Sequence, residues 1–189
     1  MQYFITHSRW GHDYDIAVGN TSAYHVVNSQ MIPGKPDLTF YSGSNKASPI
    51  IGVCRYRHFS SDMEIGLGDP NNPHTVNWEQ LNRKGVVKTR YSFRVNLGSR
   101  SPRTFTWKES TGQGHTNFKL VDERTNQVVA LFSSGNTFST EDGQLDILVE
   151  YSPRFSLLVL LTFLGLYEKM RRFKRGQKQP LMLPLGVES

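Results

Sequence analysis

Residues 152–169 read SPRFSLLVLLTFLGLYEK, and no other part of the chain stays apolar over such a length. Ser152 is a good N-cap, and Pro153 suits the first helical position, where its missing N–H costs nothing. Gly176 supplies a stop signal beyond the apolar run. The stretch therefore predicts a helix over residues 153–175.

This helix is apolar on every face, so it must be buried on every face, either in a protein core or in lipid. The 13 uncharged residues 155–167 would cover roughly 20 Å, whereas a bilayer core of about 30 Å needs about 20 helical residues. We therefore favour a helix buried in the protein's own core. A membrane span flanked by snorkelling Arg154 and Lys169, and a helix lying in the membrane interface, are the alternatives.

Length and composition indicate one globular domain, because the chain has 189 residues, of which 37% are hydrophobic and 20% charged. The first residues lack the basic and apolar regions of a signal peptide. The single cysteine, Cys54, rules out an internal disulfide. We expect a cytoplasmic monomer, peripheral at membranes if it binds them, with a nuclear location as the alternative.

Short β-type segments separated by turn clusters recur from residue 23 onward, and no helical period appears before residue 152. Residues 1–20 show no sustained period, so we expect an irregular N-terminal extension there. About eleven strands are predicted, at residues 23–28, 38–41, 50–57, 63–67, 75–78, 86–97, 103–108, 117–122, 128–132, 137–139 and 145–151.

Several of these segments alternate between apolar and polar residues, which predicts one dry and one wet face. In 88–97, for example, the apolar positions are Tyr91, Phe93, Val95 and Leu97, and the positions expected to face water include Arg90, Ser92, Arg94 and Asn96. A barrel of more than about eight strands leaves a lumen that must be filled, and an all-apolar helix is a suitable plug. We therefore predict a mainly β protein, a closed antiparallel barrel of about 12 strands over residues 21–176 around the buried helix. Residues 177–189 form a C-terminal tail, whose apolar, proline-broken part either packs or binds a partner.

The order of the later segments resembles a known family. RTFTWK at 103–108, FKLVD at 118–122, VVALF at 128–132 and LDILV at 145–149 precede the apolar helix. This order is similar to the tubby C-terminal-like clan, above all to its fungal proteins of unknown function, alongside the LURP-one-related proteins and the phospholipid scramblases. The resemblance covers roughly residues 24–175 and implies a twelve-stranded barrel around a central hydrophobic helix. It also implies possible phosphoinositide binding, which is known for tubby proper, but no site residue is carried over.

A first group of cations lies in the acid-free stretch between Glu79 and Glu109. If 86–97 is a strand, Lys88, Arg90 and Arg94 share its wet face at even positions about 6.6 Å apart. This array can hold a multiply phosphorylated headgroup. The alternative is that these residues pair with acids such as Asp146 or Glu150 and only keep the barrel soluble.

A second group lies at the helix end, where residues 153–178 carry seven Lys and Arg against one Glu. Each cation near an anionic leaflet adds about 1 kcal/mol of attraction. The alternative is that cations at a helix C-terminus only complement its dipole. A nuclear-import signal and RNA contact are further options, but no stacking-aromatic motif supports nucleic acid. The candidate residues of this group are Lys169, Arg171, Arg172, Lys174 and Arg175.

Catalytic chemistry finds little support in the sequence. The six histidines are scattered without metal-ligand spacing, and Cys54 follows an apolar run where an inert buried thiol is expected. We therefore expect no enzyme, no metal and no cofactor. The leading hypothesis is a binding module for anionic membrane lipid or phosphoinositide headgroups, with unknown protein partners. The alternatives are a scramblase-like or tail-anchored protein that uses helix 155–167, and a protein-interaction scaffold without lipid binding.

Overall fold

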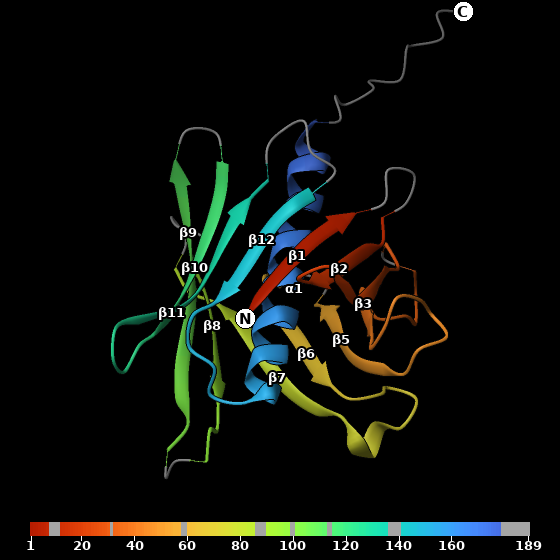
Figure 1. Ribbon diagram of the computed structural model, residues 1–189, viewed down its shortest axis with the longest axis horizontal. Helices are drawn as coiled ribbons and strands as arrows, with labels where there is room; N and C mark the ends of the chain where they lie inside the picture. The colour runs from red at the N-terminus through yellow and green to blue at the C-terminus, as the bar shows by residue number, and fades with distance from the viewer. Residues whose placement is uncertain are drawn as a thin grey trace, which may run out of the picture.

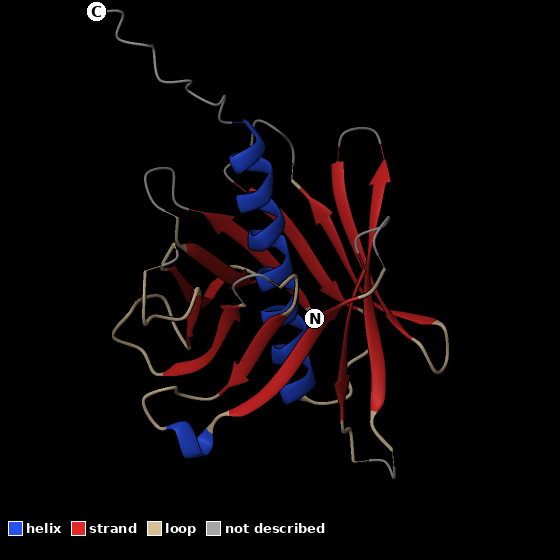
Figure 2. Cartoon of the chain, turned by 180° about the vertical axis from the view of Figure 1, so that it is seen from behind, coloured by secondary structure: helices blue, strands red, loops and turns tan. Residues whose placement is uncertain are grey.

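Twelve antiparallel strands form a closed barrel around a single helix in the computed structural model of the chain (Figures 1 and 2). Each strand pairs with its neighbours in the chain, and β1 pairs with β12 to close the barrel. The structure describes residues 1–7, 12–30, 32–57, 60–85, 90–98, 101–112, 115–135 and 141–178. The predicted fold class, a closed antiparallel barrel around a buried C-terminal helix, is confirmed.

The element bounds follow the alternation of inward apolar and outward polar residues. The strands are β1 (Gln2–His7), β2 (Tyr14–Val18), β3 (Thr21–Asn28), β4 (Leu38–Tyr41), β5 (Ile50–Tyr56), β6 (Met63–Leu67), β7 (Asn77–Arg83), β8 (Arg90–Val95), β9 (Arg103–Gly112), β10 (His115–Asp122), β11 (Gln127–Ser134) and β12 (Glu141–Ile147). A 3₁₀ helix, η1 (Pro73–Thr75), precedes β7, and helix α1 (Pro153–Lys178) ends the described chain.

The prediction of an irregular extension over residues 1–20 is wrong, because this segment supplies two strands of the barrel. Tyr3 and Ile5 of β1 and Tyr14 and Ile16 of β2 point into the core and are buried. Apolar and polar residues do alternate in both strands, but each strand has only two buried inward residues, so the pattern is short. Strand β1 lies between β2 and β12, so the barrel closes through the very residues that were assigned to an extension.

Other boundaries differ from the predicted ones for local reasons. The segment 75–78 begins in η1, where Pro73 occupies the start of the turn, and β7 follows it up to Arg83. The last strand ends at Ile147, and the side chain of Leu148 is 54% exposed. Helix α1 continues through Gly176 to Lys178, so glycine does not end it. The predicted strand 137–139 lies outside the described residues.

Helix α1 runs through the barrel (Figure 2), and its side chains from Phe155 to Leu166 meet the inward faces of the strands. Phe163 is the centre of an aromatic cluster, in which its ring contacts those of Trp107, Phe118 and Phe132. Two polar groups inside the barrel are paired, because Trp107 Nε1 donates to Thr162 Oγ1 at 3.1 Å and this hydroxyl donates to the Val159 carbonyl at 3.0 Å. The apolar segment that resembled a membrane span is thus covered by the protein's own sheet.

Polar contacts fix the start of the helix to the strands. The Ser152 hydroxyl accepts a hydrogen bond from Phe155 N at 3.1 Å, which confirms the predicted N-cap. Tyr151 lies against Arg103, and both side chains donate to the carboxylate of Asp122, which is fully buried. The start of the helix is therefore held by its cap, and the segment before it by the hydrogen bond from Tyr151 to Asp122.

The closest approach of helix and sheet depends on Gly165, and it yields a prediction. A Cβ added at Gly165 would lie 2.8 Å from Cys54 Sγ but 3.7 Å from Cys54 Cβ. Gly165→Ala alone should lower the free energy of unfolding by about 1–3 kcal/mol through overpacking. Adding Cys54→Ala removes the clashing sulfur, so urea denaturation should show the double variant to be more stable than the two single effects summed. Simple additivity would contradict the packing described for this site.

Candidate anion-binding surfaces

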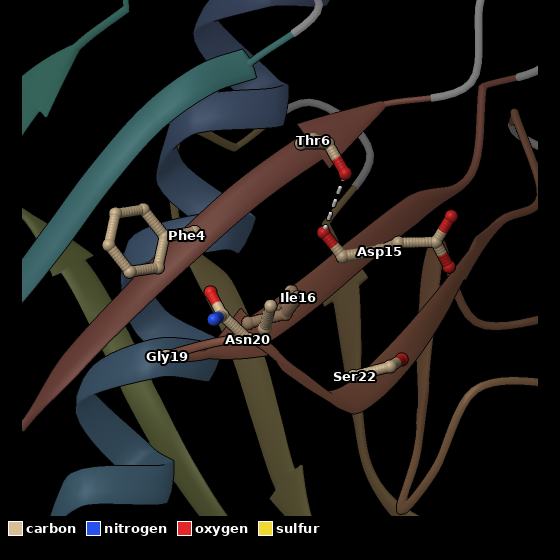
Figure 3. A pocket seen from close by; sticks show the side chains of 8 residues that line it. Phe4, Thr6, Asp15, Ile16, Gly19, Asn20 and Ser22 are labelled. Atoms are coloured by element: carbon tan, nitrogen blue, oxygen red, sulfur yellow. Dashed lines mark hydrogen bonds between the residues drawn. The ribbon is translucent and has the colours of Figure 1, made fainter.

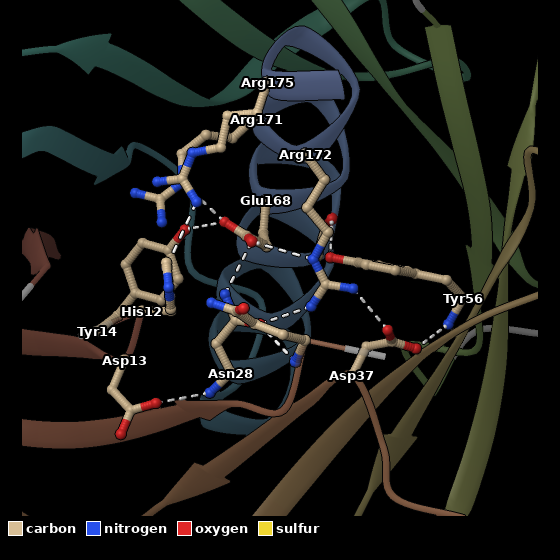
Figure 4. A network of polar contacts seen from close by, with 12 residues as sticks. His12, Asp13, Tyr14, Asn28, Asp37, Tyr56, Glu168, Arg171, Arg172 and Arg175 are labelled. Atoms are coloured by element: carbon tan, nitrogen blue, oxygen red, sulfur yellow. Dashed lines mark hydrogen bonds and ion pairs between the residues drawn. The ribbon is translucent and has the colours of Figure 1, made fainter. Parts of the chain in front are cut away.

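Arg171 and Arg172, two of the predicted ligand-binding residues, are committed to ion pairs inside the end of the barrel (Figure 4). Both reach back to Glu168 on the preceding turn of α1, whose side chain is only 1% exposed. Arg171 Nε lies 2.9 Å from Glu168 Oε2, and Arg172 Nε donates to Glu168 Oε1 at 3.1 Å. These two cations therefore neutralise a buried carboxylate, and their own side chains are only 14% and 18% exposed.

The same network ties α1 to strands β2 and β3 and to the connection that precedes β4. Glu168 also accepts hydrogen bonds from the Tyr14 hydroxyl of β2 and from Asn28 Nδ2 of β3, the latter at 2.8 Å. Arg172 bridges onward, since Nη1 lies 2.7 Å from Asp37 Oδ1 and Nη2 donates to Asn28 Oδ1 at 2.6 Å. The helix end is therefore fastened to the wall of the barrel by charged and hydrogen-bonded groups.

The protonation of Glu168 is set by two opposing effects. Burial raises the pKa of this carboxyl, but the hydrogen bond from Tyr14, the charge of Arg171 and the bonds from Asn28 and Arg172 outweigh burial, and the pKa is lowered. A second acid, Asp142 of β12, accepts from the Tyr167 hydroxyl at 3.1 Å and lies 2.7 Å from His7 Nδ1. Asp142 thus faces the helix from β12, whereas Glu168 projects from the helix toward β2 and β3.

Lys169 is also held by the protein. Its ammonium donates to the backbone carbonyl of Ser61 at 2.6 Å and lies within 3.4 Å of the carbonyls of Ser60 and Asp62. Burial lowers the pKa of this amine. Lys169 thus contributes a fixed charge at the barrel end, while its N–H groups already have acceptors.

The last described turns of α1 leave the barrel. Phe173 is 66% exposed, and Lys174 and Arg175 beside it are exposed as well. Arg175 Nη1 lies 3.4 Å from His12 Nδ1. Of the five cations predicted at the helix end, these two are the ones that the structure places at the surface.

The cations of β8 form a row across strands. Arg90 of β8 lies directly opposite Lys108 of β9, and Lys108 lies directly opposite Lys119 of β10, all on the outer face of the barrel. Lys88 lies outside the described residues. Arg94 is exposed, but Ser92 between it and Arg90 is only 4% exposed, so the predicted wet stripe along the strand is interrupted. We call Arg90, Lys108 and Lys119 the outer row.

The proposed neutralising acids have other partners. Asp146 accepts hydrogen bonds from Gln2 and Gln144, and Glu150 lies 3.0 Å from the N-terminal amine. Within the described ranges, no ion pair joins a residue of the outer row, or Arg94, to a carboxylate. Lys108 and Lys119 were not predicted, because only the strand register brings them beside Arg90.

The described residues line at least two hollows on the surface. One, of about 350 Å³, lies on the outer face of β1–β3, where Phe4, Thr6 and Asp15 are among the lining residues and Thr6 donates to the Asp15 carbonyl at 3.2 Å (Figure 3). The other, of about 400 Å³, lies where α1 leaves the barrel and is lined by cations and apolar side chains. We call it the mouth pocket.

Other predicted features are placed as follows. Cys54 is fully buried against the helix, and burial raises the pKa of its thiol, which agrees with an inert core cysteine. In the described part of the chain, no three His, Cys, Asp or Glu side chains gather in a metal-binding arrangement.

The chain matches no family model, no curated protein and no solved structure with which it was compared. Among the described residues, no helix combines the length and the hydropathy needed to cross a bilayer.

The Glu168 network predicts a dependence of stability on pH. Because the pKa of Glu168 is lowered in the folded state, its contribution is fully present above the ordinary value of 4.5 and is lost as the pH falls through the lowered value. Glu168→Gln should therefore cost about 3–5 kcal/mol at neutral pH, as for a broken buried ion pair. Urea denaturation of both proteins from neutral to acid pH should show this difference shrinking as Glu168 protonates.

Glu150→Gln is the matched control, because this side chain is 45% exposed and its ion pair with the N-terminal amine lies at the surface. Such pairs contribute about 0–1 kcal/mol. A Glu168 variant as stable as the Glu150 variant would contradict the role given to the network.

Proposed function

We propose that the protein is a non-enzymatic, tubby-like binding module that meets anionic membrane lipid, with phosphoinositide headgroups as the preferred ligands. It would act as a peripheral protein of the cytoplasm. The observation that carries this proposal is the outer row, in which Arg90, Lys108 and Lys119 lie directly opposite one another on three adjacent strands.

Without a bound anion, the like charges of the outer row repel one another and disfavour the folded protein. Side chains directly opposite on neighbouring strands have Cβ atoms about 4.5–5.5 Å apart, and like charges at this distance repel. Arg90 and Lys119, two strands apart, are separated by about 10 Å. An anion with several charged oxygens, such as a phosphorylated inositol ring or a cluster of lipid phosphates, would relieve this repulsion and supply acceptors to all three side chains.

The C-terminal end of α1 contributes less to the attraction toward an anionic membrane than its sequence suggested. Arg171 and Arg172 are used by Glu168, and Lys169 is held by backbone carbonyls. Lys174 and Arg175 remain at the surface, next to the exposed Phe173. An exposed aromatic flanked by cations suits the interface of an anionic membrane, where each cation adds about 1 kcal/mol.

The proposal predicts the effect of reversing the outer row. The triple variant Arg90→Glu, Lys108→Glu, Lys119→Glu should lose at least about tenfold in affinity for vesicles that contain phosphoinositide, since three attractions of about 1 kcal/mol each become repulsions. Co-sedimentation with phosphatidylcholine vesicles, with and without phosphoinositide, measures this. Raising the salt from about 0.1 M to about 1 M shortens the screening length from about 10 Å to about 3 Å and should weaken binding of the unaltered protein.

The control triple reverses Lys35, Lys46 and Arg124, which are exposed and lie away from the outer row, so both variants have the same net charge. The control should keep most of its binding. Equal losses in both triples would show a non-specific charge effect, and no binding of the unaltered protein to either vesicle would contradict the proposal and favour a scaffold with protein partners.

A further inference from the structure

The mouth pocket combines two kinds of surface in about 400 Å³, which is within the size range of ligand sites. Met170 and Phe173, one helical turn apart on α1, form its apolar side together with Tyr91 of β8. Phe173 is 66% exposed at the rim, whereas Met170 packs against the core. An apolar surface therefore leads from solvent into the barrel end.

The remaining lining of the pocket is charged, with a positive excess. Arg83 of β7 lies directly opposite Tyr91 and so shares its inward face, and Arg83 Nη1 donates to Ser61 Oγ at 3.2 Å. Lys169 and Lys174 contribute two more cations from α1, and Glu109 of β9 contributes the one acid among the lining residues. Arg83 and Lys174 both have contacts besides these, but a guanidinium with five N–H donors and an ammonium with three can each serve several acceptors.

We propose that the mouth pocket binds one molecule of an anionic amphiphile, with its acid group at Arg83 and Lys174 and its alkyl chain along Met170 and Phe173. The acid is a phosphate or a carboxylate, which share the charge and the acceptor oxygens that this lining recognises. The chain covers the apolar side that is otherwise open to water. This inference goes beyond the membrane-contact proposal, because the ligand is a single dissolved molecule and the outer row takes no part.

Calorimetric titration of the whole protein with four probes below their micelle-forming concentrations separates the two parts of the ligand. Decyl phosphate and decanoate carry both the acid and the chain, decanol carries the chain alone, and inorganic phosphate carries the acid alone. Binding of decyl phosphate or decanoate that exceeds the other two by tenfold or more is expected. The stronger of the first two identifies the acid group. Equal affinity for decanol would remove the acid from the proposal, and no binding of either acid amphiphile would overturn it.

Single substitutions test whether the amphiphile binds in the mouth pocket. Phe173→Ala and Lys174→Gln should each weaken amphiphile binding about threefold to tenfold. The matched controls are Leu148→Ala, which removes a 54% exposed side chain directly after β12, and Lys35→Gln, and both should leave binding unchanged. Glu109→Gln removes the acid that opposes the ligand and should strengthen binding, an effect that general damage to the fold cannot mimic. Weaker binding in the Glu109 variant, or equal losses in the controls, would refute the site.

One variant distinguishes a failure of the membrane-contact proposal from a failure of the mouth-pocket proposal. The triple reversal of the outer row should weaken vesicle binding at least about tenfold and leave the titration with decyl phosphate unchanged within twofold. Loss of both in that variant would contradict an independent mouth pocket.

Discussion

A closed sheet of twelve strands encloses more volume than its own inward side chains fill, and helix α1 occupies the remainder. The helix must therefore be apolar all round, which is unusual for a helix of a small protein. The sheet adjusts to it with small residues where the two approach most closely. A Cβ at Gly52 of β5 would lie 2.3 Å from Leu161 Cδ2, and Gly165 of α1 touches Cys54 in the same way.

The same constraint determines where the charged residues at the C-terminal end of α1 lie. Once α1 reaches the end of the lumen its side chains become charged, and the first of them, Glu168, is still buried and needs cations. Arg171 and Arg172 supply these cations. Arg171 also pairs with Asp142, and Arg172 also pairs with Asp37. A basic helix end thus has two roles that its sequence does not separate. Its first arginines hold the fold together, and only the residues beyond them face solvent.

The sequence allowed the prediction of those features that depend on local pattern. The apolar character of residues 155–167, the N-cap Ser152 and the inward apolar positions of β8 are each set within a few residues. Features that depend on pairing between distant segments could not be predicted. Nothing local places Glu168 beside Tyr14, or Lys119 beside Lys108, because register is fixed only when the barrel closes. Strands β1 and β2 were missed because their buried positions are few and are interspersed with histidine and aspartate.

Strands β8 and β9 show how one short segment can serve two surfaces. Successive side chains of a strand point to opposite faces. Arg90 therefore belongs to the outer row while Tyr91 lines the mouth pocket, and Lys108 belongs to the row while Glu109 lines the pocket. The two surfaces are separated only by the thickness of the sheet. A membrane held against the outer row would thus lie near the exposed Phe173, so an amphiphile leaving that membrane would have a short path into the barrel end.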